Sequence, residues 1–348
     1  MLFHWSQLFP GGNGLLAQWH WPGVPWLNPT LPFALGFQAL LLFFVLSGYL
    51  LMSHWLNRPL TVHTVFDFYR RRALRIYPAV WFQIMVFLSL WTVLPLLETW
   101  PTWTALWHNA LLWIGLPPSH VGGFNGVWWS LPIELMFYVV LPGLVLWVRC
   151  WNAWSMLLAC VLVSLVWRWG VMLAHPGQSM EPLRGIMDAL PGVLSTFAMG
   201  MAAACWQHRV SAAGARRLWV AGLSGLVLCE GFFVTNVSNY WQPGAMMLIW
   251  YSALAAAMAA LVLAACRGHG ARLLQSRWLV WSGEVSMGIY LWHMPVMHVF
   301  QLYWPEGDVG VWQAIASALA MLAITLALAA LSFYMIERPA MKWKKQNA

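Results

Sequence analysis

Residues 309–336 read VGVWQAIASALAMLAITLALAALSFYMI, a stretch of 28 residues without a formally charged side chain. About 20 apolar residues in a helix are enough to cross the hydrocarbon core of a bilayer. Lipid offers the backbone no hydrogen-bond partner, so such a segment must be a helix or a strand of a closed barrel, and its unbroken length favours the helix. The stretch therefore predicts a membrane-spanning helix.

The rest of the chain has the same character. Of its 348 residues, 61% are hydrophobic and only 8% are charged, whereas soluble domains carry about 25% charged residues. So few charges cannot cover a surface that faces water. We therefore expect an all-α membrane protein, with residues 1–348 forming a single transmembrane domain.

Apolar runs place the other helices. Nine candidate spans fall at about 31–55, 76–97, 128–148, 151–173, 190–206, 218–236, 245–266, 278–300 and 309–336. The opening MLFHWSQLF resembles the end of a further, truncated helix, so we expect a polytopic bundle of about ten spans and an incomplete start. A weaker tract near 104–116 is too short to cross and predicts a re-entrant or interfacial helix, and residues 10–30 read as a loop.

Basic residues test this layout. If 104–116 does not cross, 16 of the 18 Lys and Arg residues fall in connectors on one side, and only Arg168 and Arg184 do not. By the positive-inside rule that side is the cytoplasm. Residues 337–348 then form a short basic cytoplasmic tail. The formal charge of +8 is explained by topology, so we expect no nucleic-acid partner.

Several catalytic classes have no support. The five cysteines are far apart and form no C-x-x-C pair, so neither a disulfide framework nor a metal site is expected. The chain also has no P-loop, no G-x-S-x-G elbow and no H-E-x-x-H motif. This pattern disfavours an ATP-driven pump, a serine hydrolase and a zinc peptidase.

Ionisable residues inside spans are costly and therefore suggest function. On depth alone, His4, Glu134 and His293 can share one layer in the outer half of the membrane. Imidazole is the usual general base for a hydroxyl near neutral pH, and a carboxylate could orient it. Each residue also has a structural interpretation: His4 as an interfacial residue, and Glu134 and His293 as packed polar groups.

Other polar residues could support such a site. Ser286 and Tyr290 are four residues apart and share a helical face, with His293 close to it. Arg71, Arg72 and Arg75 precede a span on the cytoplasmic side, where guanidinium groups could hold phosphates. They could equally set topology or contact anionic lipid.

Two more short segments complete the pattern. Ser47 and Gly48 would permit close helix packing. Glu337 followed by Arg338 predicts an ion pair at a helix end.

Taken in order, these segments resemble the acyltransferase-3 family of integral membrane O-acyltransferases. The matching elements are LFH (2–4), FFVLSGYL (43–50), RRRALRIYP (70–78), WWSLPIELMFY (128–138), the S-x-x-x-Y-L-x-H run (286–293) and IERP (336–339). Their shared order covers nearly the whole chain.

The resemblance implies a ten-helix enzyme that passes acyl groups, usually acetyl from acetyl-CoA, to hydroxyls of glycans outside the cytoplasm. His4 matches the family's essential first-helix histidine, Glu134 the glutamate of its W-S-L-x-x-E element, and Arg72 and Arg75 its R-x-x-R motif for CoA phosphates. The family also has an arginine about three helical turns before that histidine, and this chain begins too late to contain it. Many relatives carry a C-terminal SGNH domain, which we do not expect here.

These observations combine into one hypothesis. Acyl-CoA is the donor substrate, no cofactor is permanently bound, and the phosphates rest on Arg71, Arg72 and Arg75. His4, oriented by Glu134, deprotonates a carbohydrate hydroxyl. Ser47, Ser286, Tyr290 and His293 support the site, with Ser47 and Tyr290 among the candidate oxyanion donors.

The expected location is the bacterial cytoplasmic (inner) membrane. The lipid bilayer, the acyl-CoA and a carbohydrate such as lipopolysaccharide or exopolysaccharide are the expected partners, and association into a homo-oligomer stays open. One alternative is a transporter or flippase of a glycan or small acid. A second is a non-catalytic relative that serves as an assembly partner.

Overall fold

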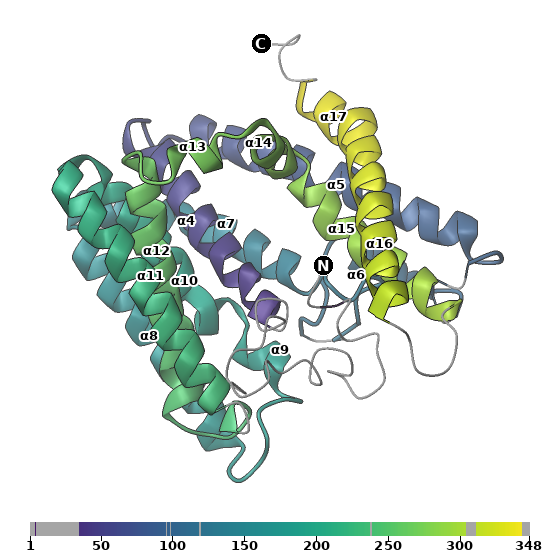
Figure 1. Cartoon of the computed structure of the whole chain (residues 1–348), viewed down its shortest axis with the longest axis horizontal. Coiled ribbons are helices and arrows are strands. Elements are labelled where there is room, and N and C mark those ends of the chain that lie inside the picture. Colours follow the sequence, from purple (N-terminus) through teal and green to yellow (C-terminus); the bar gives the residue numbers. More distant parts are fainter. Residues whose placement is uncertain are drawn as a thin grey trace. The chain divides into compact units, whose positions relative to one another are not determined.

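The computed structural model describes His4 and residues 35–94, 96–97, 99–117, 120–236, 239–303 and 311–342. These residues form helices and short connections, without a strand among them (Figure 1). The all-α prediction is confirmed. The predicted incomplete first helix apart from His4, the loop at 10–30 and positions 343–348 of the tail lie outside the described residues.

The described residues between positions 35 and 342 form seventeen helices and short helical turns, which are joined by connecting segments. In chain order they are η1 (Leu35–Gln38), α4 (Ala39–Leu56), α5 (Val62–Leu90), α6 (Trp103–Ala110), α7 (Ser130–Cys150), α8 (Ala153–Ala174), α9 (Arg184–Met187), α10 (Leu190–Trp206), η2 (Gln207–Arg209), α11 (Ala212–Thr235), α12 (Ala245–Cys266), α13 (Ala271–Leu274), α14 (Arg277–Glu284), α15 (Ser286–Leu302), α16 (Val311–Ser332), the π-helical turn η4 (Phe333–Glu337) and α17 (Arg338–Lys342).

Seven of these helices are long and apolar enough to cross a membrane. They are α4 with its preceding turn, α5, α7, α8, α11, α12 and the segment Ile315–Lys342. Helices α10 and α15 have 17 residues each, close to the lower limit of about 17 for a span. The total of about ten spans stays a prediction.

Helix α5 differs most from its predicted span of 76–97. It runs from Val62 to Leu90, so the arginine cluster lies inside the helix and not in the connector before it. Arginine is a good helix former, and Arg71 pairs with Asp67 one turn earlier at 3.4 Å. The apolar run marked the part of the helix suited to lipid, whereas the backbone helix begins well before it.

Two other predicted segments are also revised or refined. The run at 278–300 is not one helix, because α14 ends at Glu284 and α15 begins at Ser286, with Val285 between them at φ −90° and ψ 7°. The tract at 104–116 contains only the 8-residue helix α6. At a rise of 1.5 Å per residue it is about 12 Å long, too short to cross a bilayer.

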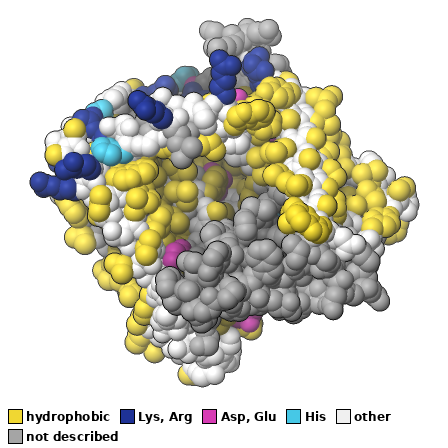
Figure 2. All heavy atoms as spheres, viewed as in Figure 1, with side chains coloured by type: hydrophobic (Ala, Val, Ile, Leu, Met, Phe, Trp, Pro, Cys, Tyr) yellow, Lys and Arg dark blue, Asp and Glu magenta, His cyan; other side chains and the backbone are white. Residues whose placement is uncertain are grey.

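The chain divides into two compact units. The first unit contains residues 1–37, 66–132 and 276–348, and the second contains residues 38–65 and 133–275. Figure 2 shows hydrophobic side chains over wide areas of the visible face, whereas Lys and Arg side chains are few and lie in separate groups. In the second unit, Arg149 lies in the last turn of α7 and Arg267 directly follows α12.

Helices α4 and α10 of the second unit approach each other through two glycines. A Cβ atom on Gly48 would lie 2.1 Å from the carbonyl oxygen of Phe197, and one on Gly200 would lie 1.9 Å from that of Val45. Small residues let helix backbones come this close in a membrane. The close packing predicted at Ser47 and Gly48 is confirmed.

Arg168 is buried in the second unit and has a complete set of partners. On α8 it is 1% exposed and pairs with Asp188 at 2.6 Å. Its guanidinium also donates to the carbonyl oxygens of Gly192 (2.9 Å) and Met247 (3.2 Å) and lies 4.2 Å from the ring centroid of Tyr251. A buried charge needs such pairing, so this basic residue outside the cytoplasmic set is explained by packing.

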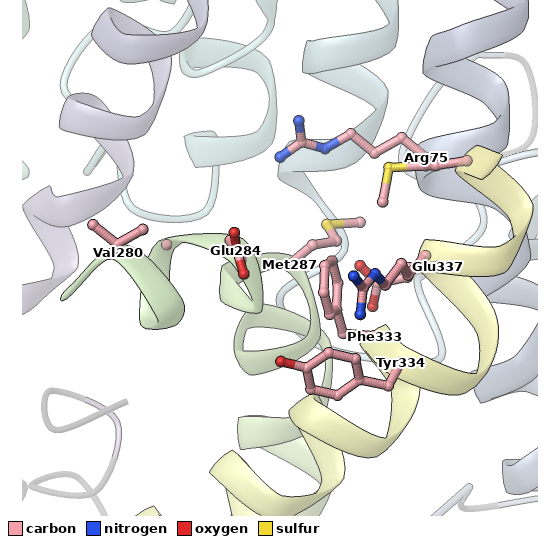
Figure 3. A pocket seen from close by; sticks show the side chains of 10 residues that line it. Arg75, Val280, Glu284, Met287, Phe333, Tyr334 and Glu337 are labelled. Carbon is pink, nitrogen blue, oxygen red and sulfur yellow. The ribbon is translucent and has the colours of Figure 1, made fainter. Parts of the chain in front are cut away.

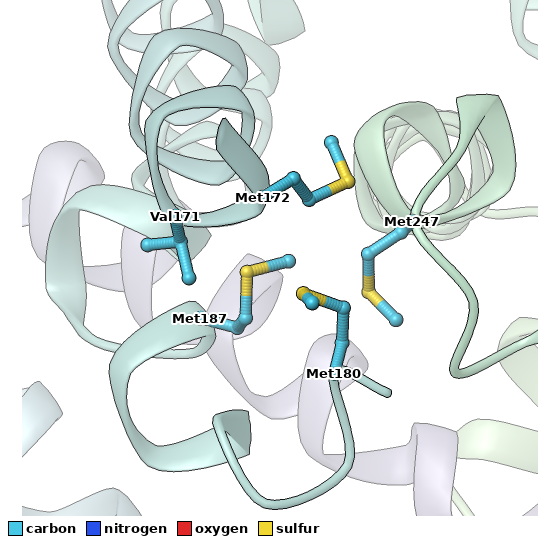
Figure 4. Close-up of a cluster of buried hydrophobic side chains, with 5 residues drawn as sticks. All are labelled: Val171, Met172, Met180, Met187 and Met247. Atoms are coloured by element: carbon cyan, nitrogen blue, oxygen red, sulfur yellow. The ribbon is translucent and has the colours of Figure 1, made fainter. Parts of the chain in front are cut away.

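A methionine-rich cluster in the same unit includes Met247. Val171, Met172, Met180, Met187 and Met247 are all at most 8% exposed and pack together, with their side chains converging from three parts of the chain (Figure 4). Methionine is flexible and fills irregular gaps. Through Met247, whose sulfur lies 3.6 Å from Arg168 Nη1, the cluster contacts the Arg168–Asp188 pair.

Candidate active site

Two histidines of the first unit lie beside each other. The ring centroids of His4 and His293 are 5.4 Å apart, and their planes are inclined at 38°. His293 belongs to α15 and is 5% exposed, and its Nδ1 lies 3.0 Å from the carbonyl oxygen of Ile289. The structure thus brings the predicted base together with one of its predicted supporting residues.

Tyr290 ties α15 to the segment that leads into α7. Its hydroxyl donates to the carbonyl oxygen of Val127 and lies 2.5 Å from Ser130 Oγ. A tyrosine hydroxyl has one proton, so Ser130 donates in the second contact. The proton that Tyr290 would offer to an oxyanion is engaged by Val127 here, while Ser286 begins the same helix one turn earlier.

Buried amides support the turn of α15 that carries His293. Pro295 has no N–H, so the carbonyl of Leu291, four residues earlier, loses its helical donor. Gln83 Nε2 and Asn125 Nδ2 each donate to that oxygen at 2.8 Å. Gln83 Oε1 in turn accepts from Asn125 Nδ2 at 3.2 Å and from Trp128 Nε1 at 3.0 Å.

The three arginines of α5 have different surroundings. Arg71 pairs with Asp67, and the Arg72 guanidinium lies 5.5 Å from the ring centroid of Phe68. Arg75 is exposed and lines a cavity of about 550 Å³. Of the three predicted phosphate-binding residues, Arg75 lines this cavity, and Arg71 and Arg72 do not.

This cavity lies within the first unit. It is lined by Arg75, Val280, Gly283, Glu284, Met287, Phe333, Tyr334, Glu337, Arg338 and Met341. Figure 3 shows Arg75 across the cavity from the side chains of Phe333, Tyr334 and Glu337. Two guanidinium groups and two carboxylates in one hollow suit a ligand with both phosphate groups and hydrogen-bond donors.

The far wall of the cavity is formed by the π-helical turn. Phe333–Glu337 precedes Pro339, whose missing N–H prevents regular α-helical bonding there. Such turns are frequent at functional sites. Glu337 accepts from Ser332 Oγ at 3.3 Å and does not form the predicted ion pair with Arg338, whose guanidinium lies 5.6 Å from the ring centroid of Tyr334.

Two further predicted residues meet in the second unit. Ser47 Oγ of α4 donates to Glu134 Oε1 of α7 at 3.5 Å, and the Tyr138 hydroxyl donates to the same oxygen. Glu134 is 6% exposed. The predicted orientation of His4 by Glu134 stays a prediction, because the two side chains belong to different units.

The comparison with known families shows to which family the protein belongs. The family model described as an acyltransferase domain, that of the acyltransferase-3 family, matches residues 1–334. The chain belongs to the acyltransferase-3 family. It is a multi-pass membrane O-acyltransferase, so the predicted family and enzyme class are confirmed and the transporter alternative is not retained.

The relatives of this acyltransferase include proteins with different names and lengths. It is 29% identical to Nodulation protein 10 of Rhizobium leguminosarum bv. viciae, over 93% of this chain and 88% of that protein. It is 31% identical to the acyltransferase MdmB of Streptomyces mycarofaciens, over 88% of this chain and 81% of that protein. No solved structure matches the chain.

A third relative is longer. The chain is 29% identical to the peptidoglycan O-acetyltransferase OatA of Listeria monocytogenes, over 88% of this chain but 51% of that protein. This acyltransferase therefore spans about half the length of that relative.

Sequence reasoning missed part of the acyltransferase site. Arg338 and Glu284 line the cavity, although the sequence suggested only a helix-end ion pair for Arg338 and, for Glu284, no role beyond that of an ionisable residue at membrane depth. Gln83 and Asn125 were not singled out at all. The sequence does contain a weak indication of their role. A buried amide within an apolar run requires a hydrogen-bond partner, and Pro295 leaves a backbone carbonyl that can accept this hydrogen bond.

Proposed function

We propose that this acyltransferase moves an acetyl group from cytoplasmic acetyl-CoA to a hydroxyl of a carbohydrate outside the cytoplasmic membrane of a bacterium. The peptidoglycan O-acetyltransferases among its relatives support the acetyl group and the carbohydrate class. The basic residues at one end of the predicted spans support the orientation. The C-terminus is then cytoplasmic.

One observation carries the proposal: α15 connects a cavity that contains two arginines to a pair of histidines. Met287 of α15 lines the cavity that contains Arg75 and Arg338. His293 lies six residues further along the same helix, an axial rise of about 9 Å. CoA also separates its phosphates from its thioester, by an extended arm.

The cavity has the size for the donor's phosphates, and it contains two arginines that could bind them. Its volume of about 550 Å³ lies within the range of about 300–1,000 Å³ that is usual for small-molecule sites. Arg75 and Arg338 can each offer paired N–H donors to phosphate oxygens. Arg71 and Arg72 belong to the same cationic stretch of α5 and are proposed to raise the local positive potential.

The chemistry then follows from the histidine. His4 removes the proton of the carbohydrate hydroxyl, and the oxygen attacks the thioester carbonyl. The tetrahedral intermediate expels the CoA thiolate, so one O–C bond forms and the S–C bond breaks. The proton taken by His4 passes to the thiolate, which leaves as a thiol.

Glu134 is proposed as a second catalytic residue. Ser47 and Tyr138 hold its carboxylate by two hydrogen bonds, which restricts its rotamers. We expect Glu134→Gln, which keeps the shape and loses the charge, to lower the rate more than Ser47→Ala does.

The proposal is tested by measuring ester-linked acetate on cell-surface carbohydrate. Cells that produce the full chain are compared with cells that produce His4→Ala, and acetate released by mild alkali is quantified. Loss of a general base lowers the rate about 10²–10⁴-fold, so His4→Ala should abolish the signal. The control is His63→Ala, which changes an exposed histidine at the start of α5. Equal acetylation in the His4→Ala and His63→Ala cells, at equal protein amounts, would refute the proposal.

A further inference from the structure

We infer that Glu284 selects the base of the acyl donor, by accepting a hydrogen bond from the amino group of adenine in the cavity that Arg75 and Arg338 also line. This inference rests on the proposed function, because it requires acetyl-CoA as the donor and its nucleotide in this cavity. Three features of the first unit support it: the two faces of the cavity, the exposure of Glu284 and the separation of the charges.

The cavity lies between two helical faces. One face comes from α14 and the first turn of α15 and the other from η4 and α17, and they consist of Val280, Gly283, Glu284 and Met287, and of Tyr334, Glu337, Arg338 and Met341. Each set has the spacing i, i+3, i+4 and i+7, which is typical of one side of a helix. A Cβ atom on Gly283 would meet nothing within 4 Å, so the space beside Glu284 is open to a ligand.

The two carboxylates of the cavity differ in their surroundings. Glu337 is 2% exposed and accepts a hydrogen bond from Ser332. Glu284 is exposed at the last position of α14. In the part of the chain that the structure describes, the ion pairs involve Asp67 and Asp188, and none involves Glu284. Glu284 is therefore the carboxylate that a ligand can reach.

The charges of the cavity are kept apart. Arg75 and Arg338 form no ion pair with a described carboxylate, and the Arg338 guanidinium lies 5.6 Å from the ring centroid of Tyr334. A phosphate is attracted by the arginines and repelled by Glu284. A carboxylate only accepts hydrogen bonds, so Glu284 needs an N–H or O–H group from another part of the same ligand.

The amino group of adenine is the group of the nucleotide that meets this need. The ribose hydroxyl of CoA is next to a phosphate, so it stays near the arginines. The base lies further from the phosphates, and its flat faces suit aromatic and apolar side chains. Tyr334 is 44% exposed, and Figure 3 shows it on the opposite side of the cavity from Glu284.

The experiment uses two inhibitors that differ only at the base. Adenosine 3′,5′-bisphosphate and inosine 3′,5′-bisphosphate carry phosphates without the pantetheine arm, and inosine has a carbonyl oxygen in place of the amino group. Each is added to membranes that contain the full chain and radiolabelled acetyl-CoA, and initial rates of acetyl transfer give its inhibition constant. In wild type the constant for the inosine compound should be about tenfold higher, because its oxygen meets an acceptor that cannot donate.

Three variants locate this preference. Glu284→Ala should weaken the adenosine inhibitor about tenfold and leave the two constants within about twofold of each other. Glu181→Ala, which changes an exposed glutamate of the second unit, should keep the wild-type preference. Gly283→Leu places a side chain in the open space and should weaken both inhibitors at least about tenfold. If Glu284→Ala does not accumulate, Glu284→Gln replaces it, since a glutamine amide can donate to the inosine oxygen and also removes the preference.

The possible results are distinct. Equal constants in wild type, or a preference for adenosine that persists in Glu284→Ala, overturns the inference. Equal weakening of both inhibitors by Glu284→Ala also overturns it, because the carboxylate then does not read the base. Full inhibition of Gly283→Leu by both compounds would remove the nucleotide from this cavity. Wild-type membranes that are no more active than His4→Ala membranes overturn the proposed function itself, whereas active membranes without the base preference overturn the inference alone.

Discussion

Replacing Arg75 by alanine should weaken the binding of acetyl-CoA and leave the chemical step intact. Arg75 is exposed and lines the cavity of about 550 Å³, which Arg338 also lines. A hydrogen bond to a charged group contributes about 1.5–3 kcal/mol. The lower end applies at an exposed, screened position, so the KM for acetyl-CoA should rise about tenfold. The kcat should stay within about twofold, because the interaction is equal in the ground state and the transition state.

The assay compares two donors with each protein. Acetyl-CoA carries the phosphates, and S-acetyl-pantetheine has the same thioester without them. Wild type should prefer acetyl-CoA in kcat/KM, and Arg75→Ala should reduce that preference about tenfold without changing the rate with S-acetyl-pantetheine. Raising the salt concentration should shrink the difference, since exposed charges are screened.

Arg70→Ala is the matched control for this experiment. Arg70 is exposed on the same helix and does not line the cavity, so its loss changes the net charge equally. It should alter the donor preference by about twofold at most. An equal effect of the two substitutions, or an unchanged preference in Arg75→Ala, would refute the placement of the phosphates at this cavity.

The remaining predictions concern stability and are checked by thermal unfolding of the detergent-solubilised protein. Gly48→Ala should lower the melting temperature strongly, because overpacking costs about 1–3 kcal/mol or more, whereas Gly143→Ala, with nothing within 4 Å of the added Cβ, should not. Asp188→Asn should destabilise by about 3–5 kcal/mol because it leaves the Arg168 charge unpaired; no change would contradict the pairing. Gln83→Leu should lower both the melting temperature and kcat, with a cost of about 1–3 kcal/mol for the polar groups it strands; a stable variant with normal kcat would show that the amide does not fix α15.

The sequence was sufficient for features that depend on composition and local pattern. Apolar runs predicted the helices at 190–206 and 245–266 with the bounds that the structure gives them. The small Ser47–Gly48 pair predicted close packing of α4, because only a residue without a Cβ fits against the Phe197 carbonyl. These are properties of a short segment, and no distant residue is needed to read them.

Features that depend on distant partners could not be predicted in the same way. The start of α5 was predicted too late because charged residues interrupt an apolar run but not a helix. The position of Arg338 at the cavity depends on the π-helical turn before it. That turn in turn depends on packing as well as on Pro339. Gln83 acquires its role only when Leu291, 208 positions later, is placed beside it.

The central claim is that the acetyl group enters from the side of the arginines and leaves on a carbohydrate on the other side of the membrane. Sealed inside-out vesicles from cells that produce the full chain expose the cytoplasmic face to added acetyl-[¹⁴C]CoA, and right-side-out vesicles expose the opposite face. The account predicts alkali-labile label on carbohydrate enclosed within the inside-out vesicles, dependent on His4, and none from right-side-out vesicles. Equal labelling in both orientations, or labelling that survives His4→Ala, would contradict it.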